Sequence, residues 1–138
     1  MNNEYVMYCI FSMEAIKAMG GNRGKLASMA GHAYLHTWWD AQYGSGDMLI
    51  TTQKEMQANA YMNSGLAKKV TLVVPTTEIL QSLYDQLKHL PYGSTLVVDR
   101  GLTVFEGPTT VCVGFGPINR DDIPDVLKPN AGVVKLLL

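Results

Sequence analysis

The sequence has 138 residues, with 11 lysines and arginines against 12 aspartates and glutamates and a formal charge of −1. Apolar residues make up 47% and charged residues 17%, which excludes a disordered chain, a collagen-like repeat and a coiled coil. The length predicts a single domain over 1–138 that can bury a core without disulfides or metal. The neutral total gives no support to nucleic-acid binding, so a phosphate-rich partner has to be argued from where the charges lie.

The first half of the chain reads as one strand followed by two helices. An apolar, β-forming run over 5–11 predicts a buried strand, and a glycine pair follows it. From Lys25 onward, apolar residues recur at three- and four-residue steps, which predicts a long amphipathic helix that ends near 43–46. A further helix is expected over about 52–63.

The third quarter of the chain alternates strand, helix and strand. A β-branched run over 69–75 predicts a second buried strand. Threonines at 76–77 cap the next helix, whose apolar stripe consists of Ile79, Leu80, Leu83 and Leu87. A turn rich in proline and glycine then leads into a third strand over 95–98.

The last quarter predicts one more strand and a packed tail. The strand covers about 109–114 and is broken by Gly116 and Pro117, and a short helix follows over 120–127. The apolar tail 133–138 is expected to pack back on the domain as an edge strand or core plug. Strands that alternate with helices predict an α/β layered domain with mainly buried strands.

The two cysteines, Cys9 and Cys112, lie in separate apolar runs and match no zinc-binding spacing. We expect two buried free thiols in a reducing compartment. The N-terminus has no basic residue ahead of an apolar stretch, and no apolar run approaches the ~20 residues that span a bilayer. The sequence predicts a cytoplasmic protein without a membrane segment.

A glycine-rich loop over 20–25, which contains Arg23, Gly24 and Lys25, precedes the long helix. Glycines let a ligand approach the backbone, and the N–H groups at a helix N-terminus attract anions. The loop is no P-loop, because Leu26 stands where a serine or threonine would hold magnesium. The pattern predicts either a phosphate-binding loop or a tight turn with solvated basic side chains.

Asp99 and Thr103 flank a glycine turn at Gly101, directly after the third predicted strand. In open α/β sheets, ligands bind outside the carboxyl ends of the strands. An aspartate at that place can orient a water, and a threonine can hydrogen-bond a reacting oxygen. An ordinary Asp-x-Gly turn is the alternative, and the pattern leaves both open. Thr109, which begins the next strand, joins such a site only if its hydroxyl faces this loop.

His32, His36 and Asp40 are spaced four residues apart on the long helix, a geometry that is compatible with a metal ion. The glutamate of a metalloprotease helix is missing, because Ala33 follows His32. We favour a surface His36 beside Asp40 and a His32 that faces a cleft, with no metal.

Five motifs in this order resemble those of the archaeal/eukaryotic-type peptidyl-tRNA hydrolase family. They are the loop and helix over 23–33, the glycine-to-valine stretch 65–70, the Asp-x-Gly-x-Thr loop 99–103, the Gly-Pro-Thr and Gly-x-Gly-Pro segments within 107–117, and the closing stretch 134–137. The likeness covers nearly the whole chain. It implies a three-layer α/β/α single domain with a mixed, mostly parallel four-stranded sheet.

The resemblance implies hydrolysis of the ester that joins a peptide to the 3′ ribose of tRNA, without a metal or an organic cofactor. It assigns catalysis to Lys25, His32, Asp99 and Thr103, and substrate binding to Arg23, Gly24, Gly101 and Thr109. In this assignment Asp99 orients or deprotonates the attacking water, directly or through His32. Lys25 and Thr103 stabilise charge on the carbonyl, and Arg23 holds a terminal phosphate. The implied partner is the 3′ end of peptidyl-tRNA, with a homodimer as a further expectation.

The sequence departs from the family pattern at two site positions. Arg23 replaces a lysine, and Met29 replaces a glutamine of the family's helix signature, while 40–61 matches no family segment. Because Met29 removes a polar side chain from the signature, one alternative is a catalytically impaired module that binds the tRNA end or a nucleotide. Neutral charge, together with adjacent tryptophans at 38–39, keeps open a protein-interaction domain.

Basic residues near these motifs favour a locally positive cleft despite the neutral total. Arg23, Lys25 and Arg100 adjoin the two loops, and we expect Lys68 and Lys69, at the mouth of the second strand, to contribute to the same cleft. The acidic residues are densest elsewhere, around 121–125.

Overall fold

The structure, a computed structural model, describes residues 3–42, 51–101, 107–129 and 133–137. The elements in chain order are β1 (Tyr5–Ser12), α1 (Met13–Ala18), α2 (Arg23–Gln42), α3 (Gln53–Ser64), β2 (Lys69–Val74), α4 (Thr77–Leu87), β3 (Ser94–Asp99), β4 (Thr109–Asn119), the 3₁₀ turns η1 (Arg120–Asp122) and η2 (Asp125–Leu127), and β5 (Lys135–Leu136). No helix in these ranges is long and apolar enough to cross a membrane.

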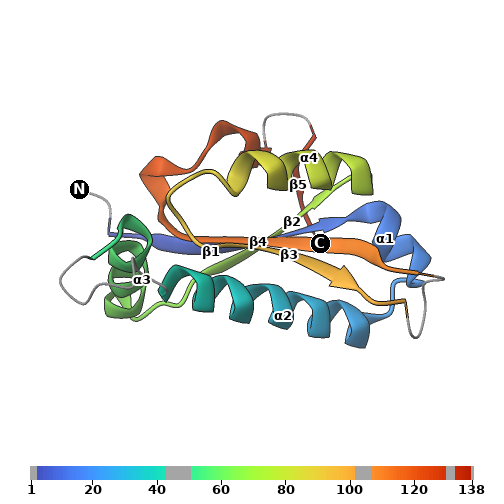
Figure 1. The fold of residues 1–138 in the computed structure, drawn as a ribbon, viewed down its shortest axis with the longest axis horizontal. Helices are drawn as coiled ribbons and strands as arrows, with labels where there is room; N and C mark the ends of the chain where they lie inside the picture. The colour runs from blue at the N-terminus through green and yellow to red at the C-terminus, as the bar shows by residue number, and fades with distance from the viewer. Residues whose placement is uncertain (1–2, 43–50, 102–106, 130–132, 138) are drawn as a thin grey trace.

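Among the described residues, five strands form one sheet in the order β3-β4-β1-β2-β5 (Figure 1). β1 pairs with β2 in parallel, whereas the other three neighbouring pairs are antiparallel. The α/β class is confirmed, but the expectation of four mostly parallel strands is wrong. A parallel neighbour needs a crossover of about a dozen residues or more, and segment 100–108 between β3 and β4 is too short for one.

The C-terminal part of the fold differs from the sequence prediction in two ways. β4 does not end before Gly116 and Pro117 but continues to Asn119, because a register shift opposite β1 accommodates these two residues. The helix expected over 120–127 is instead two 3₁₀ turns, and Pro124 lies between them. The tail is confirmed as an edge strand, because β5 pairs with β2 at the end of the sheet.

The short helix α1 was not predicted from the sequence. Ser12 caps it, since its hydroxyl oxygen accepts a hydrogen bond from the Ala15 N–H at 3.1 Å. Ala15 and Ile16 are buried beneath it. A helix of six residues is too short to produce the apolar periodicity on which prediction depends.

Two apolar clusters fill the two faces of the sheet and give the molecule three layers (Figure 1). α4 covers one face through Leu80, Leu83 and Leu87, three of the four stripe positions, whereas Ile79 is exposed. α1 and α2 cover the other face, where Cys9 and Cys112 are buried and free, as expected.

Helix α2 lies unusually close to the sheet. A Cβ at Gly114 of β4 would overlap the buried Thr37 hydroxyl of α2, and a Cβ at Gly93 would lie 2.6 Å from the Thr37 carbonyl oxygen. Both strand-side glycines therefore allow a backbone approach that any side chain would block. This approach fixes the position of α2 over β3 and β4, and with it the residues at the N-terminus of α2.

Candidate active site

The carboxyl ends of three strands meet at one end of the molecule. β1 and β2 are parallel, and β3 has the same direction because both β3 and β1 are antiparallel to β4. α1 and α4 begin directly after β1 and β2, and α2 also begins at this end (Figure 1). This is the end at which α/β sheets bind ligands.

Asp99, the last residue of β3, is joined to Lys25 in the first turn of α2. The Lys25 Nζ lies 2.8 Å from Asp99 Oδ2, and the Gly101 N–H donates to Asp99 Oδ1 at 2.8 Å. The Asp99 side chain is only 7% exposed and that of Lys25 22%. Both carboxylate oxygens therefore have donors, as a buried charge requires. The sequence had singled out both residues but had not predicted that they pair directly.

These contacts determine the charge of the carboxyl group. The hydrogen bond from Lys25, and next that from the Gly101 N–H, hold the pKa of Asp99 below its ordinary value of 3.8. Burial acts in the opposite direction but is outweighed. At neutral pH Asp99 is consequently an ionised carboxylate, with the Lys25 side chain beside it.

Gly101 is required by its backbone conformation and by its neighbours. Its φ is +79°, and a Cβ there would lie 2.6 Å from the backbone carbonyl of Gly107. This turn places the Gly101 N–H on Asp99. The Asp-x-Gly turn and the ligand site, which the sequence left as alternatives, are therefore compatible, because one carboxylate oxygen completes the turn and the other holds Lys25. Gly107, the first residue of the Gly-Pro-Thr motif, is the residue that Gly101 contacts.

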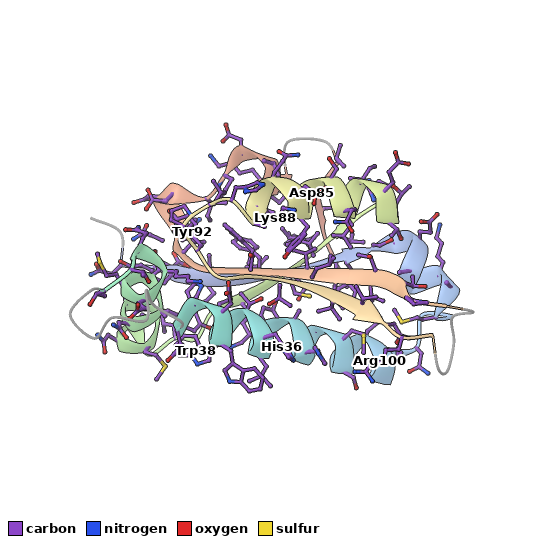
Figure 2. The ribbon with its side chains drawn as sticks, viewed as in Figure 1. His36, Trp38, Asp85, Lys88, Tyr92 and Arg100 are labelled. Atoms are coloured by element: carbon purple, nitrogen blue, oxygen red, sulfur yellow. The ribbon has the colours of Figure 1, made fainter. Side chains whose placement is uncertain are left out.

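The predicted loop over 20–25 ends earlier than expected. α2 begins at Arg23, so Arg23, Gly24 and Lys25 form its first turn. The Asn22 side chain accepts a hydrogen bond from the Lys25 N–H at 3.0 Å, which makes Asn22 a helix cap that the sequence analysis had not identified. Arg23 is exposed, and this turn holds no acidic residue. Figure 2 shows Arg100 beside the same end of α2.

Thr109 lies directly opposite Asp99 in the pairing of β3 with β4. Its hydroxyl donates to the Gly107 carbonyl at 3.0 Å, on the same turn that Gly101 contacts. The structure thus brings Thr109 next to the Asp99 loop. Thr103 lies outside the described residues.

His32 is not among the contacts described for Asp99. It is exposed on α2, seven residues after Lys25, and its ring stacks on His36 with centroids 4.3 Å apart. Asp40 instead pairs with Lys54 at 3.2 Å and accepts from the Ser94 N–H at 3.0 Å. The two histidines and Asp40 thus do not converge, and the described ranges contain no group of three or more potential metal-binding side chains.

Met29 packs against the buried cluster beneath α2 rather than on an open polar surface. Its carbonyl accepts a hydrogen bond from the Cys112 thiol at 3.6 Å. A glutamine at this position would bring a polar amide against apolar neighbours, so the methionine suits the local packing.

The expectation that Lys68 and Lys69 contribute to the cleft is wrong. Lys68 and Lys69 do not join the cleft, because they lie at the amino end of β2, at the opposite end of the sheet. Lys68 pairs with Glu4, and Lys69 donates to the Tyr61 hydroxyl at 3.2 Å.

Contact with Cys112, together with burial, raises the pKa of the Cys9 thiol, which opposes a role as a nucleophile.

Two comparisons with known proteins identify the family of this chain. The sequence model of the family described as "Peptidyl-tRNA hydrolase PTH2" matches residues 6–129. A curated protein of Methanopyrus kandleri named "Peptidyl-tRNA hydrolase" is 32% identical over 105 residues, which cover 76% of this chain and 81% of the relative. The stretch matched by the family model includes every described candidate site residue. The chain therefore belongs to the PTH2 peptidyl-tRNA hydrolase family.

Proposed function

We propose that the protein hydrolyses the ester bond between a peptide and the 3′ ribose of tRNA, and that Asp99 and Lys25 are its central catalytic residues. The observation that carries the proposal is the buried Lys25–Asp99 pair, 2.8 Å long, at the carboxyl end of β3. The family and the name of the relative supply the reaction class. Because peptidyl-tRNA arises at ribosomes, we expect the protein to act in the cytoplasm.

The chemistry requires few groups. A water adds to the ester carbonyl, and collapse of the tetrahedral intermediate releases the peptide acid and the 3′ hydroxyl of tRNA. A carboxylate whose pKa is lowered is a weak base, so we assign Asp99 mainly to orienting this water and stabilising the positive charge beside it. The proton leaves to solvent or to the departing oxygen.

Lys25 is the group best suited to stabilise the developing oxyanion. Its ammonium has three donors, so it can contact Asp99 and still direct a proton toward the carbonyl oxygen. We assign Thr103 to the same task from its position in the Asp-x-Gly-x-Thr motif. Arg23, exposed in the same helical turn as Lys25, would hold the terminal phosphate.

The remaining proposed residues shape the site. Gly24 precedes Lys25 in the first turn of α2, Gly101 donates its N–H to Asp99, and Thr109 lies opposite Asp99 in the pairing of β3 with β4. Seven residues of helix, about 10 Å of rise, separate His32 from Lys25. Of the two routes considered for the water, the direct one through Asp99 is therefore favoured, and His32 is left to contact the substrate farther from the ester.

The test is release of an N-acetylated aminoacyl group from charged tRNA by Asp99→Asn. General acid–base and orienting contributions of this kind are worth about 10²- to 10⁴-fold, so we expect the initial rate to fall by that factor. Asp40→Asn is the matched control, because Asp40 also pairs with a lysine and a β3 N–H but lies at the other end of α2. Its rate should stay within about twofold of wild type.

Turnover that survives Asp99→Asn would remove the catalytic assignment. A wild-type protein that binds tRNA without hydrolysing the ester would instead support the alternative of an impaired binding module. Met29→Gln then shows whether the departure at that position matters, because it restores the family's residue in a matched background.

A further inference from the structure

Three aromatic rings form a continuous row on the surface of α2. His32 and His36 stack with centroids 4.3 Å apart and planes 11° from parallel. The Trp39 ring meets His36 edge to face at 5.0 Å. His32 is exposed, and half of Trp39 remains accessible. We call these three residues the ring strip.

The ring strip continues the face of α2 that begins at Lys25. At 100° per residue, all three positions lie within about 40° of Lys25 around the helix axis. The rise of 1.5 Å per residue places them about 10 to 21 Å beyond Lys25 along that axis. Trp38, by contrast, projects toward α3 and approaches the Tyr61 ring at 6.0 Å. The strip thus extends the proposed active site along one side of the helix.

The charge on this face suits a polyanion. α2 contains no acidic residue before Asp40, and Arg23 and Lys25 lie in its first turn. Figure 2 shows Arg100 near that end and His36 midway along the helix. Cationic side chains followed by accessible rings are the combination with which proteins bind single-stranded nucleic acid.

We propose that the ring strip stacks the unpaired bases at the 3′ end of the tRNA while its terminal ester lies at Lys25 and Asp99. This inference rests on the proposed function and deepens it, because it assigns a binding surface for the nucleotides that precede the ester. Stacking on histidine and tryptophan faces accepts any base, so the strip recognises an unpaired end rather than a sequence. A second copy of the chain fits less well, since an interface needs roughly 800 Å² from each partner and three rings in a single row offer less.

The test is a double-mutant cycle between protein and RNA. Binding of uncharged tRNA, and of the same tRNA without its unpaired 3′ nucleotides, is measured for wild type, His36→Ala and Trp39→Ala. With intact tRNA we expect each alanine variant to raise Kd about fivefold to thirtyfold. With truncated tRNA both variants should match wild type, because the partner bases are gone. Trp39→Phe, which keeps an aromatic face, should recover most of the affinity.

Ile79→Ala is the matched control, because it removes an exposed apolar side chain from α4, which covers the face of the sheet opposite to α2. Equal losses with intact and truncated tRNA, or no loss with either, would overturn the inference. A dimer that dissociates in Trp39→Ala, seen by sedimentation, would also overturn it and assign the strip to a second copy. These measurements need no turnover, so failure of ester hydrolysis and failure of the ring strip are separate results.

Discussion

A lysine–aspartate pair lies at each end of β3, and each pair contains one residue of α2. At the carboxyl end of β3, Lys25 and Asp99 are 2.8 Å apart, and the carboxylate is 7% exposed. At the amino end, Lys54 and Asp40 are 3.2 Å apart with side chains 27% and 39% exposed, and Asp40 also accepts from the Ser94 N–H. Each aspartate thus receives a lysine and one backbone N–H.

The difference between the two pairs is their contact with water. An exposed pair is worth about 0–1 kcal/mol, because water competes for both ions. A buried carboxylate has little contact with water, so its charged form is stabilised by its protein donors. Removing one of these donors therefore destabilises the protein strongly. The same two residue types therefore stabilise helix packing at the amino end of β3 and form a candidate catalytic pair at its carboxyl end.

Replacement of each lysine in turn should give the largest difference between the two pairs. We expect Lys25→Met to lower kcat/KM for peptidyl-tRNA by about 10²- to 10³-fold, the usual cost of losing one oxyanion donor. Lys54→Met should change it by less than about twofold. Steady-state hydrolysis measures both, with thermal unfolding to verify that each variant is folded. Similar losses in the two variants would show that the ammonium at Lys25 has no special role.

The turn at Gly101 should be the next most sensitive point. Gly101→Ala adds a clash with Gly107 to the strain of a positive φ, so we expect it to lower the free energy of unfolding by about 2–4 kcal/mol. Gly20→Ala is the control, because Gly20 has a φ of +67° and open space around its Cβ position. Its cost should be about 1–2 kcal/mol, from strain alone. Denaturant titration gives both values, and equal costs would refute the role of the Gly107 contact.

The ionisation of Asp99 should appear in the pH dependence of stability. Since its pKa is lowered on folding, the unfolded chain binds the proton more readily, and the stabilisation is fully present above 3.8. It is lost as the pH falls through the lowered pKa. The free energy of unfolding of wild type should therefore drop more steeply than that of Asp99→Asn between about pH 5 and pH 2.

Glu4 and Asp125 also have lowered pKa values, and both are present in wild type and in Asp99→Asn. Their contributions to the pH dependence of stability therefore cancel when the two proteins are compared. Parallel curves for the two proteins would mean that Lys25 and Gly101 do not stabilise the charged form of Asp99.

The exposed pair should give the smallest effect. In a double-mutant cycle with Asp40→Asn and Lys54→Met, we expect a coupling energy below about 1 kcal/mol. The asparagine oxygen can still accept from the Ser94 N–H, so that contact is preserved. A coupling as large as that between Lys25 and Asp99, obtained from urea unfolding, would contradict the distinction drawn from exposure.

The long helix and the strands were readable from the sequence, because their apolar residues repeat over several turns or form continuous buried runs. The start of α2 at Arg23 was harder to place, since the cap is the Asn22 side chain and the preceding glycines resemble a loop. β4 continues through Gly116 and Pro117 because its pairing with β1 resumes beyond the register shift. This pairing outweighs the tendency of glycine and proline to end a strand. The predicted strand directions were also wrong, although the short connection between β3 and β4 already excludes a parallel pairing of these two strands.

The sequence by itself determined the α/β class, the buried strands, and the identity of Asp99, Lys25, Arg23 and Thr109 as candidate site residues, because local patterns and motif order depend only on neighbours in the chain. The tertiary structure alone decided which of them meet. It pairs Asp99 with Lys25, brings Thr109 opposite Asp99 and places Lys68 at the opposite end of the sheet. The pairing of Asp99 with Lys25 depends on the direction of β3 and on the close approach of α2 to Gly93 and Gly114. The place of Lys68 depends on the direction of β2 beside β1. All of these are contacts between residues far apart in the chain.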